Sequence, residues 1–198
     1  MQIAAEEESR LVARSRQGDL DAFNSLVEMY QAAAYNLCLR LLGSREAAED
    51  ATQEAFLSAF RHIAGFRGGS FRSWLLRIAA NAATDELRRR GRRPQMPLES
   101  GPEQEGPAHL LPDSGPGPEA VVLRREVVRQ VEAGLLTLPA DQRLVVVLSD
   151  VQGLSYEEVA QVTGASLGTI KSRISRGRER LRRYLSELGT FGSGAASL

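Results

Sequence analysis

The sequence predicts an all-α protein with two small helical domains joined by a flexible, acidic, proline-rich linker. Apolar residues recur at helical spacing on both sides of the linker, and no β-type alternation of useful length occurs. Seven of the eight prolines lie within residues 94–118, among Gly, Ser, Glu and Asp, so this stretch cannot form a packed core. We expect an N-terminal domain over 1–93, the linker over 94–118, a C-terminal domain over 119–186 and a disordered tail over 187–198.

The composition excludes several classes of protein. With 198 residues and 42% apolar content, the chain can form ordinary globular cores. The longest strongly apolar run, 144–148, is far shorter than the roughly 18 residues of a membrane span, and residues 6–8 are all Glu where a signal peptide is positive. We expect a cytoplasmic protein with no direct membrane insertion. Cys38 is the only cysteine, so we expect no internal disulfide. With only His62 and His109 beside it, we also expect no metal site and no cofactor.

The net charge of zero hides a strong segregation of charge along the chain. Residues 67–93 hold eight arginines against two acids, whereas residues 94–120 hold five acids and no Lys or Arg. Of the 25 basic residues, 24 are arginine, which suits bidentate contacts with phosphates and bases. The segregated charge therefore indicates a nucleic-acid partner despite the neutral total.

The first predicted helix carries a continuous apolar stripe from Phe23 to Leu41, with Asp19 or Asp21 as its N-cap and Gly43 as its end. A second helix begins at Ser44 and runs to about residue 63. Its inner face consists of small residues that allow close packing, namely Ala48, Ala51, Ala55 and Ala59.

The opposite face of the second helix is acidic with a leucine in its middle. Its residues are Glu46, Asp50, Gln53, Glu54 and Leu57. A leucine in such a setting is not well explained by solvation alone, and we interpret the face as a docking surface for a basic, partly apolar partner helix. An ordinary exposed leucine is the alternative.

A glycine-rich loop over 65–70 and a third helix complete the N-terminal domain. Ser70 caps this helix, whose apolar stripe is Phe71, Trp74, Leu75, Ile78 and Ala82, so Trp74 is expected in the core rather than as a base-stacking platform. Its other face is suited to backbone contacts and a base contact through Arg77, Asn81, Thr84 and Arg88. In the loop, Phe66 and Arg67 can bind an unstacked base, although a plain inter-helix turn fits equally well.

After the linker, residues 121–136 and 141–151 read as two helices separated by the Leu138-Pro139 break. A helix-turn-helix follows. Ser155 and Glu158 form a capping box, and Thr163 and Gly164 end the first of its two helices. Apolar residues line one side of the second helix, which begins after residue 166: Ile170, Ile174, Leu181 and Leu185.

The outer face of that last helix holds only hydrogen-bond donors and positive charge. Residues 166–185 contain seven basic residues against one acid. Small polar side chains near the helix start can reach base edges, and arginines can reach guanine edges or phosphates. A merely solvated basic helix is the alternative. The expected DNA-binding residues are Ser166, Thr169, Lys171, Ser172, Arg173, Arg176 and Arg180.

Two segments together resemble the extracytoplasmic-function (ECF) group of bacterial sigma factors in the sigma-70 family. They read DATQEAFLSAFRHIAGFRGGSFRSWLLRIAANAATDELRRRGRR and, after the linker, LPADQRLVVVLSDVQGLSYEEVAQVTGASLGTIKSRISRGRERLRRYL. The resemblance implies a non-enzymatic protein with a domain 2-like bundle and a domain 4-like helix-turn-helix. Such a protein binds core RNA polymerase through the β′ clamp coiled coil and the β subunit, recognises promoter DNA and helps to open it. The resemblance also implies that an anti-sigma factor controls the protein.

The resemblance assigns roles to the surfaces found above. Asp50, Gln53, Glu54 and Leu57 match the region that docks on the β′ clamp. The 65–70 loop and the third helix match the parts that read and melt the −10 element, and the helix after residue 166 matches the −35 reader. A stand-alone helix-turn-helix repressor or activator would leave the acidic face and the second basic helix unexplained. A nucleic-acid enzyme would need a Walker-type loop, zinc-deaminase spacing or a two-metal carboxylate cluster, none of which we find.

Overall fold

The computed structural model describes residues 2–92 and 118–189, and every regular element within these two ranges is helical. No helix there is long and apolar enough to cross a membrane. The expected linker and tail fall largely outside the described residues. The elements are α1 (Gln2–Ser15), α2 (Leu20–Leu42), α3 (Arg45–His62), η1 (Ile63–Gly65), α4 (Phe71–Arg92), α5 (Pro118–Thr137), α6 (Ala140–Val146), η3 (Val147–Val151), α7 (Tyr156–Thr163) and α8 (Leu167–Glu187).

Helix α1 is an element that the sequence patterns did not predict. It packs along α2, where Leu11 and Val12 are buried in the same cluster as Phe23 and Leu26. The hydroxyl of Tyr30 in α2 donates to the carboxylate of Glu8. The N-terminal group therefore has four main helices, α1 to α4, instead of the three expected.

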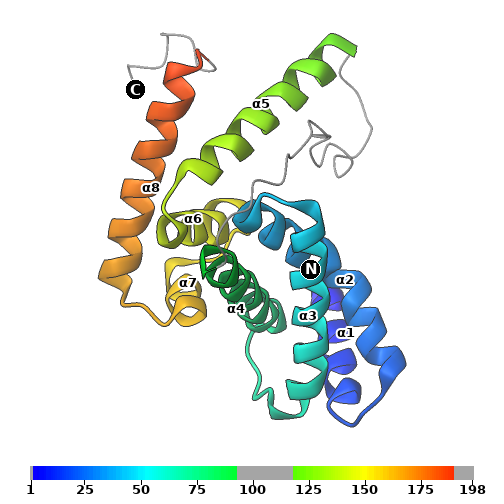
Figure 1. Ribbon diagram of the computed structural model, residues 1–198. Coiled ribbons are helices and arrows are strands. Elements are labelled where there is room, and N and C mark those ends of the chain that lie inside the picture. The colour runs from blue at the N-terminus through cyan, green and yellow to red at the C-terminus, as the bar shows by residue number, and fades with distance from the viewer. Residues whose placement is uncertain (1, 93–117, 190–198) are drawn as a thin grey trace.

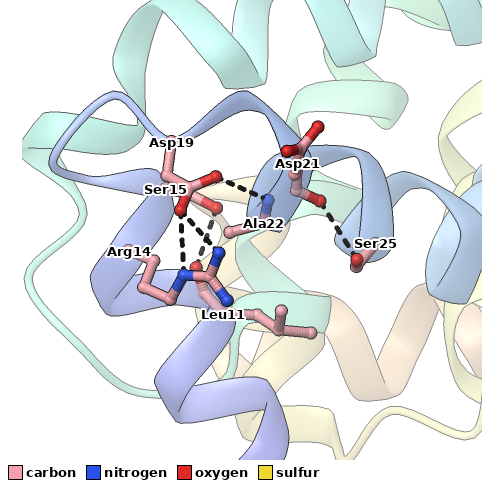
Figure 2. Close-up of polar contacts among 7 residues, drawn as sticks. All are labelled: Leu11, Arg14, Ser15, Asp19, Asp21, Ala22 and Ser25. Atoms are coloured by element: carbon pink, nitrogen blue, oxygen red, sulfur yellow. Dashed lines mark hydrogen bonds and ion pairs between the residues drawn. The ribbon is translucent and has the colours of Figure 1, made fainter.

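The turn between α1 and α2 is built around Asp19 (Figure 2). Its carboxylate accepts from the Ala22 amide at 3.0 Å and from Arg14 Nε at 2.8 Å. These two donors, the amide first, hold the pKa of Asp19 below its usual value. Asp21 contributes only its backbone carbonyl, which accepts from the Ser25 hydroxyl at 3.0 Å. Of the two candidate N-caps of α2, Asp19 is therefore the one used.

Helices α2 and α3 have the caps and the packing face that the sequence predicts. Gly43 ends α2 in the left-handed conformation, with φ 68°, and its N–H donates to Leu39 O at 2.8 Å. Ser44 caps α3 by accepting from the Ala47 amide. The expected inner face is confirmed, since its four alanines are all buried: Ala48, Ala51, Ala55 and Ala59.

The buried arc of α4 is wider than its predicted stripe. Phe71 and Leu75 are buried as expected, but Trp74, Ile78 and Ala82 are only partly buried. Four further residues are buried in their place: Leu76, Ala79, Ala80 and Ala83. The reason is that α4 is covered on two sides, by α2 and α3 and by α7 of the C-terminal half.

The C-terminal half consists of α5, α6, η3, α7 and α8. The predicted helix over 141–151 is α-helical only to Val146 and then continues as the π-helical turn η3. The helix-turn-helix is confirmed. Ser155 and Glu158 form both hydrogen bonds of the capping box, Gly164 ends α7 at φ 70°, and Ser166 caps α8 by accepting from the Thr169 amide.

The two halves share one hydrophobic core, which the sequence patterns did not predict. In Figure 1, α4 lies against α7, and α2 lies near α5 and α6. Leu76 and Ala79 of α4 belong to the same buried cluster as Val145, Leu148 and Val159. The described residues therefore form one packed body.

Polar contacts cross the same boundary. Gln152 accepts from Arg72 Nη2 at its backbone carbonyl (2.7 Å) and at its side-chain oxygen (3.0 Å), and its amide nitrogen donates to Ala33 O at 3.1 Å. Arg143 Nη1 donates to Leu41 O at 2.5 Å. Since buried polar groups are costly when unpaired, these bonds make the arrangement of the halves specific.

Candidate nucleic-acid interface

The expected DNA-binding face of α8 is assembled largely as predicted. Four of its residues are exposed: Ser166, Lys171, Arg176 and Arg180. Thr169 and Ser172 are partly buried, and their hydroxyls are engaged in local hydrogen bonds. The Thr169 hydroxyl lies 2.9 Å from Ser166 Oγ, and Ser172 Oγ donates to Thr169 O. The face therefore presents a polar N-terminal end and a cationic middle.

Arg173 and Arg176 lie in different settings on this face. Arg173 is partly buried, with its Nε 3.0 Å from the carboxylate of Asp141 on α6. Arg176 is exposed, and its Nη2 donates to Ser172 Oγ at 3.3 Å. Arg176 is consequently the arginine whose charge is more available to a ligand.

A second ion pair on α8 was missed at the level of sequence. Arg178 binds the carboxylate of Asp150 on η3 through two contacts of 2.9 and 2.5 Å. The hydrogen bonds that Arg178 donates to the Asp150 carboxylate raise the pKa of Arg178 above its usual value. The pair joins residues 28 positions apart, so no local spacing could have indicated it.

The outer face of α4 is also largely as expected. Arg77, Asn81 and Arg88 are exposed on one side of the helix, and Arg88 pairs with Asp85 at 3.1 Å. Thr84 is partly buried, and its hydroxyl donates to Ala80 O at 2.7 Å. Thr84 therefore offers its methyl group more readily than its hydroxyl.

Phe66 differs from the expectation of a ring exposed in the 65–70 loop. It is buried, with its ring centroid 5.8 Å from that of Phe71 and 5.3 Å from that of Trp74. Burying a phenylalanine stabilises a fold by about 1.5–3 kcal/mol, and the aromatic contacts add to this. Arg67 remains exposed, beside Gly68 and Gly69, which both have positive φ. The loop thus presents backbone and Arg67, while Phe66 anchors it.

The acidic face of α3 is exposed at all four expected positions: Asp50, Gln53, Glu54 and Leu57. Leu57 is 46% exposed. Phe60, 37% exposed, lies one turn further along and was not among the expected residues, although its i+3 spacing from Leu57 was a usable signal. The ring of Phe60 also packs edge-on against Phe23 at 5.0 Å. The face therefore has an apolar strip of two side chains beside its acids.

The part of the chain that the structure describes holds no group of three His, Cys, Asp or Glu side chains arranged for a metal ion. Cys38 is fully buried between α2 and α4, where its sulfur lies 3.9 Å from Ala79 O. Burial raises the pKa of this thiol to about 11. Cys38 therefore serves as a core residue, and the chemistry of the surfaces described above is that of hydrogen bonding and charge.

Comparison with protein families matches both halves of the chain. Residues 26–93 match the model described as Sigma-70 region 2, which includes α4 and the acidic face of α3. Residues 129–181 match the model described as Sigma-70, region 4, and this range contains α7 and most of α8. The two matched ranges contain all the expected site residues.

Curated relatives match over nearly the whole chain. The chain is 39% identical to RNA polymerase sigma-H factor of Pseudomonas aeruginosa over 190 residues, which cover 94% of this chain and 97% of that protein. It is 38% identical to ECF RNA polymerase sigma factor SigE of Mycolicibacterium smegmatis over 175 residues, which cover 88% of this chain and 66% of that longer protein.

Solved structures agree in fold. CnrH in complex with the cytosolic domain of CnrY matches with a TM-score of 0.66 at 25% identity, over 91% of this chain and 98% of that chain. The sigma factor RpoE in complex with the anti-sigma factor NepR, from Bartonella quintana, matches with a TM-score of 0.63 at 27% identity, over 83% and 96% of the two chains. Both matches extend over the two helical halves.

Proposed function

Because the chain belongs to the ECF group of sigma-70 RNA polymerase sigma factors, we propose that it binds core RNA polymerase, directs it to specific promoters and opens them without catalysing a reaction itself. The observation that carries this proposal is the polar and cationic face of α8, presented by a helix-turn-helix whose described residues up to 181 lie within the region 4 match. The cytoplasm, where the polymerase and the chromosome are, is its place of action.

The upstream (−35) element is read by α8. Its N-terminal end carries Ser166 and Thr169, whose small hydroxyls suit base edges in the major groove. Arg176 and Arg180 are exposed further along and supply base or phosphate contacts, with Lys171 on the flank. Phosphate neutralisation by these cations provides much of the affinity, which should fall steeply with salt.

The downstream (−10) element is read and melted by α4 and the loop that precedes it. Arg77 and Arg88 contact the backbone, Asn81 recognises a base, and Arg67 holds an unstacked base against the glycine-rich loop. Unstacking a base costs a few kcal/mol, part of which its capture offsets. We assign Phe66 the support of this loop instead of base stacking, because its ring is already covered by Phe71 and Trp74.

Core polymerase binds the acidic face of α3. The carboxylates of Asp50 and Glu54 complement a basic partner, and Leu57 with Phe60 provides the apolar surface that such an interface buries. The β′ clamp coiled coil is the partner that fits this chemistry. The C-terminal half contacts the β subunit and thereby brings α8 to the DNA.

An anti-sigma factor is the expected regulator. The two solved neighbours are complexes of a sigma factor with NepR and of CnrH with the cytosolic domain of CnrY. Because those chains match this one over both helical halves, a partner that holds the halves together is compatible with the packing seen here.

Run-off transcription tests the proposal. Core RNA polymerase is incubated with genomic promoter fragments, with and without the full chain, and transcript starts are mapped. We expect starts that depend on the added chain and share two upstream sequence elements. Binding to duplex DNA that is unchanged by core polymerase, together with no dependent start sites, would instead identify a stand-alone helix-turn-helix regulator.

A further inference from the structure

Helix α8 is seated on the helix formed by α6 and η3 through a buried stripe that includes Ile170, Ile174 and Gly177. Gly177 makes this seat possible, because a Cβ at its position would lie 2.7 Å from Val146 Cγ2 and 3.5 Å from Gln142 O. The backbone of α8 therefore approaches α6 more closely than a larger residue would allow. This close packing fixes the distance between α8 and α6. The apolar stripe alone does not fix the rotation of α8 about its own axis.

An arginine stands at each edge of the stripe. At about 100° per residue, Arg173 and Arg178 lie about 140° apart around the axis of α8. Arg173 pairs with Asp141 of α6 at 3.0 Å, and Arg178 binds Asp150 of η3 at 2.9 and 2.5 Å. The two ion pairs thus tie opposite flanks of α8 to the same supporting helix.

The π-helical turn contributes to this arrangement. In an uninterrupted α-helix, Asp141 and Asp150 would lie about 180° apart around the axis. Here both carboxylates contact α8, and Asp150 does so from within the π-helical turn Val147–Val151. Such turns are rare and recur at functional sites.

Two carboxylates beside a DNA-binding face repel phosphates and so lower the affinity for DNA of any sequence. Their presence therefore needs an explanation other than electrostatic attraction to DNA. Geometry does account for them. With a helix diameter of about 10–12 Å, a roll of about 20° displaces a side-chain tip by about 2 Å. A hydrogen bond to a base edge tolerates donor–acceptor distances of only about 2.7–3.2 Å and would be lost. A long arginine that contacts a phosphate can follow the movement.

We propose that Asp141 and Asp150 are positioning residues, which act through Arg173 and Arg178 to fix the roll of α8 and so determine how sharply it discriminates between −35 sequences. This inference rests on the proposed function of α8. The acids trade general DNA affinity for sequence discrimination. Neither acid touches the DNA in this role.

The test uses the full chain assembled with core polymerase. A promoter found by start-site mapping is prepared with about ten randomised base pairs at the −35 position, and bound molecules are sequenced. Competition between the recovered duplex and a scrambled duplex of equal composition then gives a discrimination ratio. The variants are Asp150→Asn and the exchange Asp150→Arg with Arg178→Asp. The matched control is Glu179→Gln, which removes an equal charge from α8 but breaks only the pair with Arg182 on the same helix.

We expect Asp150→Asn to lower the discrimination ratio about tenfold, the loss of roughly one good base contact, while binding to the scrambled duplex stays level or rises. The charge exchange should restore most of the ratio, and Glu179→Gln should leave it unchanged. Asp141→Asn should act in the same direction as Asp150→Asn. If Asp150→Asn unfolds below the assay temperature, the test relies on the exchange of Asp150→Arg with Arg178→Asp, which keeps an ion pair between the two positions.

Different failures have different meanings. If Asp150→Asn and Glu179→Gln raise binding to both duplexes in parallel and leave the ratio intact, Asp150 acts only as a charge and the inference is wrong. The same holds if the exchange fails to recover discrimination although the protein is folded. If the unmodified chain recovers no preferred sequence at the randomised block, the assignment of α8 to the −35 element fails as well.

Discussion

Ser73 of α4 donates a hydrogen bond of 2.8 Å to Glu158 of α7, the residue whose other carboxylate oxygen accepts from the Ser155 amide in the capping box. One carboxylate therefore both starts the helix-turn-helix and joins it to the helix assigned to the −10 element. The Ser155 amide first, and then Ser73, lower the pKa of Glu158. The N-terminal turn of α4 is thus fixed to the C-terminal half by charge-assisted bonding.

Glu158→Gln should reduce stability at neutral pH and make stability less sensitive to acid. Because the pKa of Glu158 is lowered by folding, the stability that its ionised form contributes is fully present above the unfolded value of about 4.3 and is lost as pH falls through the folded pKa. Thermal unfolding from pH 7 to pH 3 measures this. The gap in Tm between the two proteins should narrow below about pH 4.3. A gap that is constant over this range would contradict the role of the charge.

Gln152→Ala should destabilise the packing between the halves. Gln152 is buried, and its side chain bonds Arg72 and Ala33 O. The truncation therefore removes two hydrogen bonds between the halves, at about 0.5–1.5 kcal/mol each, or about 1–3 kcal/mol together. Urea unfolding gives the difference. The matched control is Gln161→Ala on the exposed side of α7, which should stay within about 0.5 kcal/mol. Equal effects of the two substitutions would mean that the contact across the halves adds nothing.

Arg176→Ala should weaken binding to a promoter by about 1–3 kcal/mol, because it removes an exposed arginine of the α8 face that pairs with no acid in the described structure. Affinities of the holoenzyme for promoter and scrambled duplexes separate the two kinds of contact. A loss confined to the promoter indicates a base, and a uniform loss with a shallower salt slope indicates a phosphate. Arg182→Ala, which removes a charge already paired with Glu179, is the control. Unchanged binding would remove Arg176 from the interface.

Asn81→Ala should impair transcription from duplex promoters more than from promoters that are already melted around the −10 element. The reason is that Asn81 is assigned to the stabilisation of separated strands, which costs a few kcal/mol to create. Run-off yields from the two templates provide the ratio. Gln31→Ala, at an exposed residue of α2, serves as the comparison. Equal losses on both templates would show that Asn81 has no part in opening.

Leu57→Ser should lower the affinity for core polymerase about three- to tenfold, since fully burying a leucine contributes about 1.5–3 kcal/mol and slightly less than half of this residue remains to be buried. The fold should be unaffected because the side chain is 46% exposed. Leu20→Ser, at a leucine that is 58% exposed at the start of α2, is the matched control. Fluorescence titration with core polymerase measures both. The docking assignment fails if the two variants bind alike.

The features that the sequence predicted well depend on neighbours within a few positions. The capping box of Ser155 and Glu158, the left-handed end at Gly164 and the alanine face of α3 are each fixed by local backbone geometry or helical spacing. The exposure of Leu57 and Arg176 followed from the same periodicity. For these elements, local physics and the final fold agree.

The features that were missed depend on contacts between distant positions. Phe66 lies in a loop whose glycines indicate exposure, yet the hydrophobic gain from Phe71 and Trp74 decides its place. Arg72 and Gln152 are 80 positions apart, so neither helical spacing nor caps could reveal that α4 is covered on a second side. Arg178 counts as an ordinary basic residue until Asp150 is placed beside it.

The core shared by the two halves has a consequence for biosynthesis. Leu76 and Ala79 belong to the same buried cluster as Val145, Leu148 and Val159, which follow them by roughly 70 to 80 positions. At a translation rate of about 5–20 residues per second, the ribosome leaves the apolar side of α4 uncovered for several seconds to about 15 seconds. The nascent N-terminal helices therefore fold while an apolar surface of α4 is exposed to the cytoplasm. We expect the chain to depend on chaperones most during this interval.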